Sequence, residues 1–307
     1  MSKKRYFRNK LAECSGDVKN TWKIINRVMC SNLDSKNNTN LNINYNDRIV
    51  SDSFELSNVF NDRFSSIGSR LANNVHESLY QLEDFLGPYV NGDFVPVDTN
   101  ELEVLDLIGE LSDASAGYYS VPTHLIKKIK NEIVKPLTHI CNISFQTGVF
   151  PSQLKQSKVI PLHKGGTKSD LHNYRPISLL SVFSKIIEKL MYMRFEIFLE
   201  DNEVLIDQQY GFRKKKSTTG AILRLTDYIL KSFDERKFVI AAFLGLSKAF
   251  DTVDHNVLIT KLNYIGVRGV ALDWFVSYLH ERKQFTVYKN VYSNNKRQLT
   301  RFLKGLY

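Results

Sequence analysis

One stretch of this 307-residue chain decides how the rest is interpreted: Phe243-Leu244-Gly245-Leu246-Ser247-Lys248-Ala249-Phe250-Asp251-Thr252-Val253-Asp254-His255. It continues an apolar run that starts at Phe238, whose β-branched and aromatic residues predict a buried strand. The run breaks at Gly245 and gives way to a small, acidic segment. A strand followed by an acidic turn is where metal-dependent phosphoryl-transfer enzymes place a carboxylate. A core strand before a solvated helix explains the stretch equally well, so other segments must decide.

Composition favours a folded chain with an anionic partner. Apolar residues make up 43% of the sequence, enough for a core, and the length suits one large domain or two ordinary ones. Lys and Arg number 42 against 32 Asp and Glu, which gives a formal net charge of +10. A positive field attracts nucleic acid or an anionic membrane surface, although charge alone identifies neither.

The cysteines and the apolar runs indicate in which cellular compartment the protein is expected. Cys14, Cys30 and Cys141 are too few and too far apart for a disulfide framework or a zinc site, which favours a reducing compartment. The basic N-terminus lacks the apolar segment of a secretory signal. No apolar run approaches the ~20 residues of a membrane span. We therefore expect an intracellular protein, nuclear or cytoplasmic, without a membrane partner.

The first half of the chain is predicted to be helical with polar connections. Residues 1–31 predict one or two helices, with Trp22, Ile25 and Val28 at helical spacing in the second part. Residues 31–48 are rich in Asn, Ser and Asp and predict a loop or linker. Ser53 is a candidate cap for the next helix, and Asp98 and Glu101 have capping-box-like spacing. Apolar spacing predicts four further helices, over Ser53–Leu71, Glu101–Leu111, Pro122–Ile133 and Pro136–Thr147.

After Pro151 strand-like and helical patterns mix. Gly165 and Gly166 turn one strand-like run into the next, which predicts a hairpin. The predicted strands are Ser157–Lys164, Tyr174–Leu180, Phe238–Leu244 and Gln284–Tyr292. The predicted helices are Ser184–Leu199, one from the basic cluster Gln209–Ser217 to Phe233, Asn256–Ile265 and Val270–Leu279.

Five motifs in this second half carry a resemblance to a known family. In chain order they are Pro161-Leu162-His163-Lys164-Gly165-Gly166 with Asn173-Tyr174-Arg175-Pro176-Ile177-Ser178-Leu179-Leu180, then Glu188-Lys189, Gln209-Tyr210-Gly211-Phe212-Arg213 with Ser217-Thr218, Leu246 to His255, and Trp274-Phe275-Val276-Ser277-Tyr278-Leu279. Together they resemble the reverse transcriptase domain of non-LTR retrotransposons, particularly the jockey-like group.

The resemblance implies an α+β fold, a partial right-hand polymerase with fingers and an incomplete palm behind an N-terminal helical extension. It divides the chain into a basic linker remnant with a polar loop (1–50), a helical extension (51–148) and the reverse transcriptase domain (149–307). The family copies an RNA template from a DNA primer with two Mg²⁺ ions, so both nucleic acids are the implied partners.

Lys164 and Arg175 occupy the family's positions beside the incoming triphosphate, whose charge requires cations. A guanidinium suits phosphate better than an ammonium does, because it binds two oxygens at once. The alternative is that both side chains merely solvate an exposed hairpin. Phe250 matches the aromatic residue that packs under the nucleotide sugar, where a ring excludes a 2′-hydroxyl; a core position is its alternative.

Arg213, Lys214 and Lys215 match the family's second fingers motif, near the template. Gly211 before them allows a close backbone approach, and a sugar-phosphate backbone is the expected neighbour. A solvated charged face is the alternative, and it is the interpretation that we give to Lys127–Lys130 and Arg282-Lys283. We expect no metal-binding histidine, and structural roles for Lys248 and Asp251.

Two departures from the family predict that this chain is catalytically inactive. The family has a metal-binding aspartate five residues before the sugar-packing aromatic, and Gly245 stands there instead. Mg²⁺ requires oxygen ligands, which glycine does not supply, so productive metal binding is not expected. The sequence ends at Tyr307, before the family's paired-aspartate motif, so we expect a truncated copy in which Gly245→Asp alone restores nothing.

Three outcomes remain open on these residues. The chain is an inactive fragment of a retrotransposon reverse transcriptase, or it persists as a non-catalytic nucleic-acid-binding remnant, as its +10 charge suggests. A third possibility is that it does not fold stably, because an incomplete palm leaves a sheet edge that invites aggregation.

Overall fold

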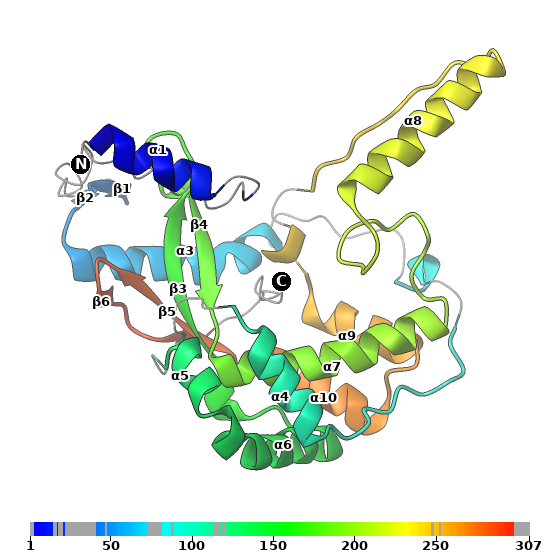
Figure 1. Ribbon diagram of the computed structural model, residues 1–307, viewed down its shortest axis with the longest axis horizontal. Helices are drawn as coiled ribbons and strands as arrows, with labels where there is room; N and C mark the ends of the chain where they lie inside the picture. Colours follow the sequence, from blue (N-terminus) through cyan, green and yellow to red (C-terminus); the bar gives the residue numbers. More distant parts are fainter. Residues whose placement is uncertain are drawn as a thin grey trace. The chain divides into compact units, whose positions relative to one another are not determined.

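The computed structural model contains a small N-terminal unit, Met1–Ser51, and a large unit, Asp52–Tyr307. In the small unit, helix α1 (Lys3–Glu13) confirms that residues 1–31 contain a helix, and strands β1 (Ile43–Tyr45) and β2 (Arg48–Val50) pair antiparallel (Figure 1). This hairpin was not expected, because residues 31–48 predicted a loop. The structure describes residues 3–14, 17, 21, 41–46, 48–72, 82–86, 89–112, 117, 121–246, 249–251 and 253–297, and the second helical pattern near Trp22 lies outside them.

Six helices of the large unit share one hydrophobic core. The core includes Phe145 from α6 and Trp274 from α10, whose indole Nε1 donates to the Ser144 Oγ at 3.0 Å. Gly148 ends α6 with φ +67°, and an added Cβ there would lie 2.7 Å from the carbonyl oxygen of Val270. The helices are α4 (Glu101–Glu110), α5 (Thr123–Lys128), α6 (Lys130–Thr147), α7 (Val182–Asp201), α9 (His255–Tyr264) and α10 (Gly269–Leu279).

A mixed sheet of five strands completes the large unit. Its order is β4-β3-β5-β6, with β7 also paired to β5; β3 runs antiparallel to β4 and parallel to β5. Helix α3 (Ser53–Ala72) packs on the sheet through Phe60, whose ring lies 4.9 Å from Tyr174 and 5.9 Å from Tyr288. The strands are β3 (Gln156–His163), β4 (Tyr174–Leu179), β5 (Lys283–Tyr288), β6 (Val291–Tyr292) and β7 (Lys296–Arg297).

Several local expectations need correction. The cap of α3 is Asp52, whose Oδ1 accepts from two backbone N–H groups, and the cap of α4 is Asn100, so neither Ser53 nor Asp98 has that role. The expected helix boundary near Pro136 is wrong, because Pro136 lies inside α6. The single strand expected over Gln284–Tyr292 is instead a hairpin of β5 and β6.

The α+β class is confirmed, since helices and strands are both prominent. The core draws residues from both sides of position 148, for example Phe145 and Ile186, while the proposed boundary between an extension and a polymerase domain stays a prediction. Over the part of the chain that the structure describes, no helix has both the length and the apolar character to cross a membrane.

Candidate functional site

The β3–β4 hairpin forms where the two glycines predicted it. Gly165 (φ +118°) and Gly166 (φ +80°) turn the chain, and a Cβ on Gly166 would lie 2.8 Å from the side-chain nitrogen of Asn173. The Lys164 N–H donates to the Asn173 carbonyl at 2.8 Å, and the Asn173 side chain donates to the Thr167 carbonyl at 3.0 Å. Backbone and side-chain hydrogen bonds therefore fix the tip of this hairpin.

Lys164 and Arg175 lie at this tip, and both side chains are exposed. Arg175 is paired in register with Leu162, so these two residues share one face of the hairpin. Leu162 and the neighbouring pair Ile160 and Ile177 are also exposed on this face. Among the described residues neither cation has a carboxylate partner, so the hairpin presents two unpaired cations beside an apolar strip.

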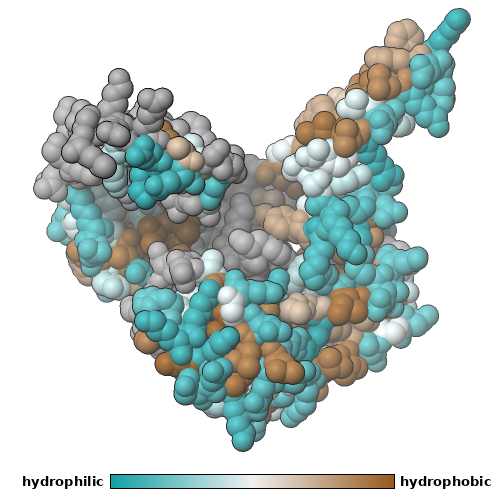
Figure 2. Space-filling model, viewed as in Figure 1, coloured by the Kyte–Doolittle hydropathy of each residue, from teal (hydrophilic) through white to brown (hydrophobic). Residues whose placement is uncertain are grey.

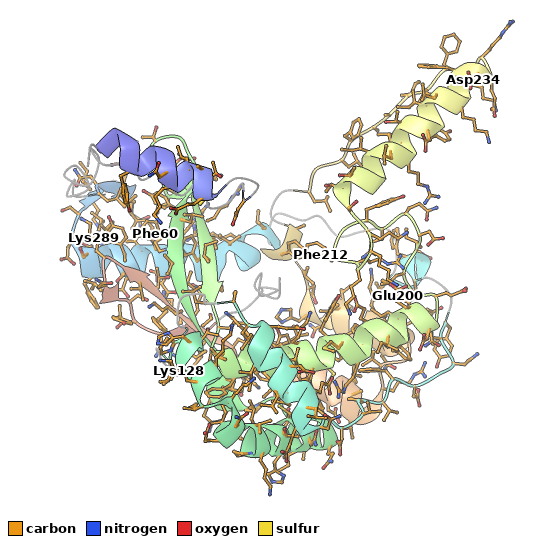
Figure 3. All side chains as sticks on the ribbon, in the orientation of Figure 1. Phe60, Lys128, Glu200, Phe212, Asp234 and Lys289 are labelled. Carbon is orange, nitrogen blue, oxygen red and sulfur yellow. The ribbon has the colours of Figure 1, made fainter. Side chains whose placement is uncertain are left out.

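Arg213 is held by the chain itself. Its Nε and Nη2 donate to the two carboxylate oxygens of Glu200 at 3.1 and 2.7 Å, and its Nη1 donates to the Ile206 carbonyl at 2.8 Å. The Arg213 side chain is 9% exposed. Figure 3 labels Glu200, near the end of α7, and Phe212 in the loop that follows. The guanidinium therefore ties this loop to α7, and its predicted contact with a template remains untested.

The lysines after Arg213 differ in their partners. Lys214 Nζ contacts Glu196 at 2.6 Å, and Lys216 Nζ donates to the Asp207 carbonyl at 3.0 Å. Lys215 has φ +62° and an exposed side chain without an ion pair to any described residue. Lys215 is thus the cation of this cluster that is most available to a phosphate.

Two of the predicted motifs meet at a pair of aromatic rings. Phe250 lies in a short 3₁₀ helix, Ala249–Asp251, and its ring centroid is 5.7 Å from that of Phe212 in a T-shaped contact. Phe212 belongs to the Gln209–Arg213 motif, so the structure brings the second fingers motif next to the predicted sugar-packing residue. Nothing in the spacing of these residues along the chain indicated that contact.

The predicted strand Phe238–Leu244 is wrong. The segment is irregular, and Phe238, Ile240 and Phe243 are 100%, 96% and 83% exposed. A strand needs a neighbour for its backbone N–H and C=O groups, and none of the described strands pairs with this run. The preceding helix α8 (Thr218–Asp234) also leaves apolar side chains uncovered, as the brown surface of that helix in Figure 2 shows.

Gly245 lies in this open segment. A Cβ added to it would meet no atom within 4 Å, so space does not exclude a larger residue. Asp254 caps α9 by accepting from the N–H groups of Asn256 and Val257 at 2.7 and 3.1 Å, and the Asp251 side chain lies outside the described residues. Within the described ranges, no three His, Cys, Asp or Glu side chains gather in a way that fits a metal ion.

A buried ion pair escaped the sequence analysis. Arg282, expected to be solvated, is 2% exposed, and its Nη2 lies 3.7 Å from Oε1 of buried Glu188. Ser184 Oγ donates to Glu188 at 2.9 Å. Burial raises the pKa of Glu188 above its ordinary value, against the opposing effect of Arg282 and of hydrogen bonds from Ser184 and Tyr278. The Glu188-Lys189 motif singled out Glu188 in the sequence, but it did not indicate that Arg282 is its partner.

Comparison with known proteins confirms the resemblance. Residues 162–305 match the family model described as reverse transcriptase (RNA-dependent DNA polymerase). A probable RNA-directed DNA polymerase from transposon BS of Drosophila melanogaster is 33% identical over 199 residues, covering 62% of this chain and 21% of that protein. The RNA-directed DNA polymerase from mobile element jockey of the same species is 30% identical over 161 residues, covering 52% of this chain and 18% of that protein.

These relatives are much longer than the chain, which spans about a fifth of their length. The chain therefore resembles the reverse transcriptase domain of jockey-like non-LTR retrotransposons, and the matched residues include both the hairpin cations and the Gly245 position. Nucleic acid substrates and a divalent metal are general properties of this family.

Proposed function

We propose that residues 149–307 are the fingers and the first part of the palm of a right-hand reverse transcriptase from a non-LTR retrotransposon. Residues 51–148 are then a helical extension in front of it, and residues 1–50 a linker remnant. The observation that carries the proposal is the hairpin inside the segment that matches the family, with Lys164 and Arg175 exposed and without an ion pair to any described residue. An intracellular location, nuclear or cytoplasmic, belongs to the same proposal.

In this proposal the hairpin binds the triphosphate of an incoming nucleotide. Lys164 offers a point charge and Arg175 a planar fork for two phosphate oxygens, while the exposed apolar strip around Leu162 suits the face of a base. Phe250 lies under the sugar and favours deoxynucleotides. Arg213 supports this arrangement by holding its loop on α7, and Lys214 and Lys215 lie along the template.

Binding of a fluorescent deoxynucleoside triphosphate tests the hairpin. We expect the K164Q/R175Q variant to bind at least about fivefold more weakly than the wild type, because each charged contact contributes about 1 kcal/mol or more. The matched control is K128Q/K135Q, which removes two exposed cations from α5 and α6. Equal affinities of the two variants would contradict the role of the hairpin.

We further propose that this copy does not catalyse polymerisation. The family implies a divalent metal, Mg²⁺ being the expected ion, and the residues here do not fit one: Gly245 carries no ligand and Asp254 is occupied as a helix cap. Hard cations of this kind need carboxylate oxygens held together, so no productive metal site is expected from these residues. Templated extension of a primer by this chain would contradict the proposal.

The second candidate function is non-catalytic binding of nucleic acid. It is favoured by Lys164, Arg175 and Lys215, which have no carboxylate partner among the described residues, and by the charge of +10. If phosphates dominate, the logarithm of the affinity for a single-stranded oligonucleotide falls linearly with the logarithm of the salt concentration. Binding that is insensitive to salt, or absent at low salt, would reject this function.

A further inference from the structure

A polar cavity of about 570 Å³ lies at the start of β3. All the side chains that line it are polar or charged, and three of them are cations: Lys155, Lys283 and Arg297. Glu281 is the one carboxylate among the lining residues, so their formal charge is +2. The volume is in the range of small-molecule sites.

The sheet topology brings the three cations together from distant parts of the chain. Lys155 ends the 3₁₀ helix that leads into β3, and the next residue, Gln156, pairs with Lys283 on the parallel strand β5. Lys283 in turn pairs with Arg297 on the antiparallel strand β7. Like charges directly opposite each other across two strands are destabilising, so the fold tolerates a repulsion here that a bound anion would relieve.

Lys155 is unusually buried for a lysine. This lysine is 8% exposed, and among the described residues its Nζ has one hydrogen bond, at 3.4 Å, to the Ser277 Oγ. An ammonium has three donors, so this hydrogen bond leaves the hydrogen-bonding capacity of Lys155 partly unused among the described residues. Burial lowers its pKa below the ordinary value, opposed by Glu281 and reinforced by Arg282. Lys155 has no ion pair with a described residue, and Glu281 offsets its burial only in part, which favours an anionic ligand.

We propose that this cavity binds a phosphate group, with Lys155, Lys283 and Arg297 as its donors. Arg297 suits two phosphate oxygens and the lysines supply point charges. Lys164 lies eight residues after Gln156, the first residue of β3, about 26 Å away at roughly 3.3 Å per residue, so the cavity is separate from the tip of the hairpin. The phosphate belongs either to a small polyphosphate or to a nucleic-acid backbone.

Two probes distinguish these sources in the full chain: inorganic tripolyphosphate by calorimetry and a fluorescent 12-nucleotide oligouridylate by anisotropy. The variants are made in the K164Q/R175Q background, so that the hairpin proposed to bind a triphosphate does not take up the probe. We expect K283Q/R297Q to weaken tripolyphosphate binding about tenfold or more, K128Q/K135Q to leave it within about twofold, and E281Q to strengthen it by removing the repelling carboxylate. Lys283, Arg297 and Glu281 are exposed, so these variants should fold, which circular dichroism checks.

If the cavity takes backbone phosphates, K283Q/R297Q also weakens oligouridylate binding and reduces the salt slope by about two. An unchanged oligouridylate affinity instead assigns the site to a small polyphosphate. The K164Q/R175Q variant keeps tripolyphosphate binding at the cavity, so failure of the hairpin proposal can be told apart from failure of this one. Tripolyphosphate binding that K283Q/R297Q leaves unchanged, or that K128Q/K135Q weakens equally, overturns the proposal.

Discussion

Strands were predicted both at β3 and over Phe238–Leu244, yet only β3 is a strand in the structure. Val159 in β3 is fully buried and has β4 on one side and β5 on the other, whereas Phe243 is 83% exposed and pairs with no described strand. The residue composition of a segment makes a strand possible, but the segment forms a strand only where a neighbouring strand pairs with it.

The hairpin and the segment that leads to Gly245 also differ in what they contribute to the candidate site. The hairpin that carries Lys164 and Arg175 is a preformed scaffold, fixed by its turn, its register and the packing of α3. Gly245 directly follows the Phe238–Leu244 run, which pairs with no described strand, and glycine itself offers no side-chain ligand. In our proposal the chain therefore keeps the part of the site that binds the nucleotide and lacks the part that would hold the metal.

The largest expected effect comes from a charge placed in the paired strand. Val159→Asp would bury a carboxylate without a counter-ion, which we expect to lower the free energy of unfolding by about 4 kcal/mol or more. Phe243→Asp in the unpaired run should change it by no more than about 0.5 kcal/mol. Urea denaturation followed by circular dichroism measures both, and equal losses would refute the contrast.

Arg282→Met tests how β5 is anchored beside β3, because Arg282 immediately precedes β5 and contacts Glu188 on α7. Removing one partner of a buried pair should cost about 3 kcal/mol near neutral pH. The folded-state pKa of Glu188 is already raised above 4.5, and losing Arg282 raises it further. The stability that the raised pKa of Glu188 contributes is fully present below pH 4.5. It is lost as the pH rises through the folded-state pKa of Glu188.

The loss in the free energy of unfolding that Arg282→Met causes should therefore increase from pH 5 to pH 8. Denaturation midpoints across that range measure it. In the double variant E188Q/R282M position 188 cannot ionise, so the growth should disappear. A cost of Arg282→Met that is the same at pH 5 and pH 8 would exclude an ionising Glu188.

The unpaired apolar run should promote self-association through its open backbone and side chains. We expect I240K/F243K to shift the chain toward the monomer in size-exclusion chromatography, since added charges block edge-to-edge contacts. The control is L102K/L125K, which adds the same charge at two exposed leucines of α4 and α5. An identical elution shift in both variants would show that charge alone, and not the run, controls association.

The smallest effect is expected at the glycine. Gly245→Asp enters open space in an irregular segment, so the free energy of unfolding should change by less than about 0.5 kcal/mol. A larger loss in thermal or urea unfolding would mean that Gly245 has a packing role and is not simply a missing ligand.

Local patterns predicted much of this fold. The Gly165-Gly166 turn identified the hairpin, and helical spacing identified α3, α4, α7 and α10, because both signals lie within a few residues. Features that depend on residues from other parts of the fold were not predicted. Examples are the lack of a described strand beside Phe238, the ion pair between Glu200 and Arg213, and the buried ion pair between Arg282 and Glu188. A motif locates a residue along the chain, but its partners come from elsewhere in the fold.

We propose above all that this chain keeps a nucleotide-binding hairpin while lacking the chemistry of the family that it resembles. Primer extension on an RNA template, with Mg²⁺ and the four deoxynucleoside triphosphates, tests it most directly when primer–template binding is recorded for the same sample. We predict binding that weakens with salt and no added nucleotide at any enzyme concentration. Addition of the nucleotide complementary to the template, dependent on Mg²⁺ and on this chain, would contradict the account.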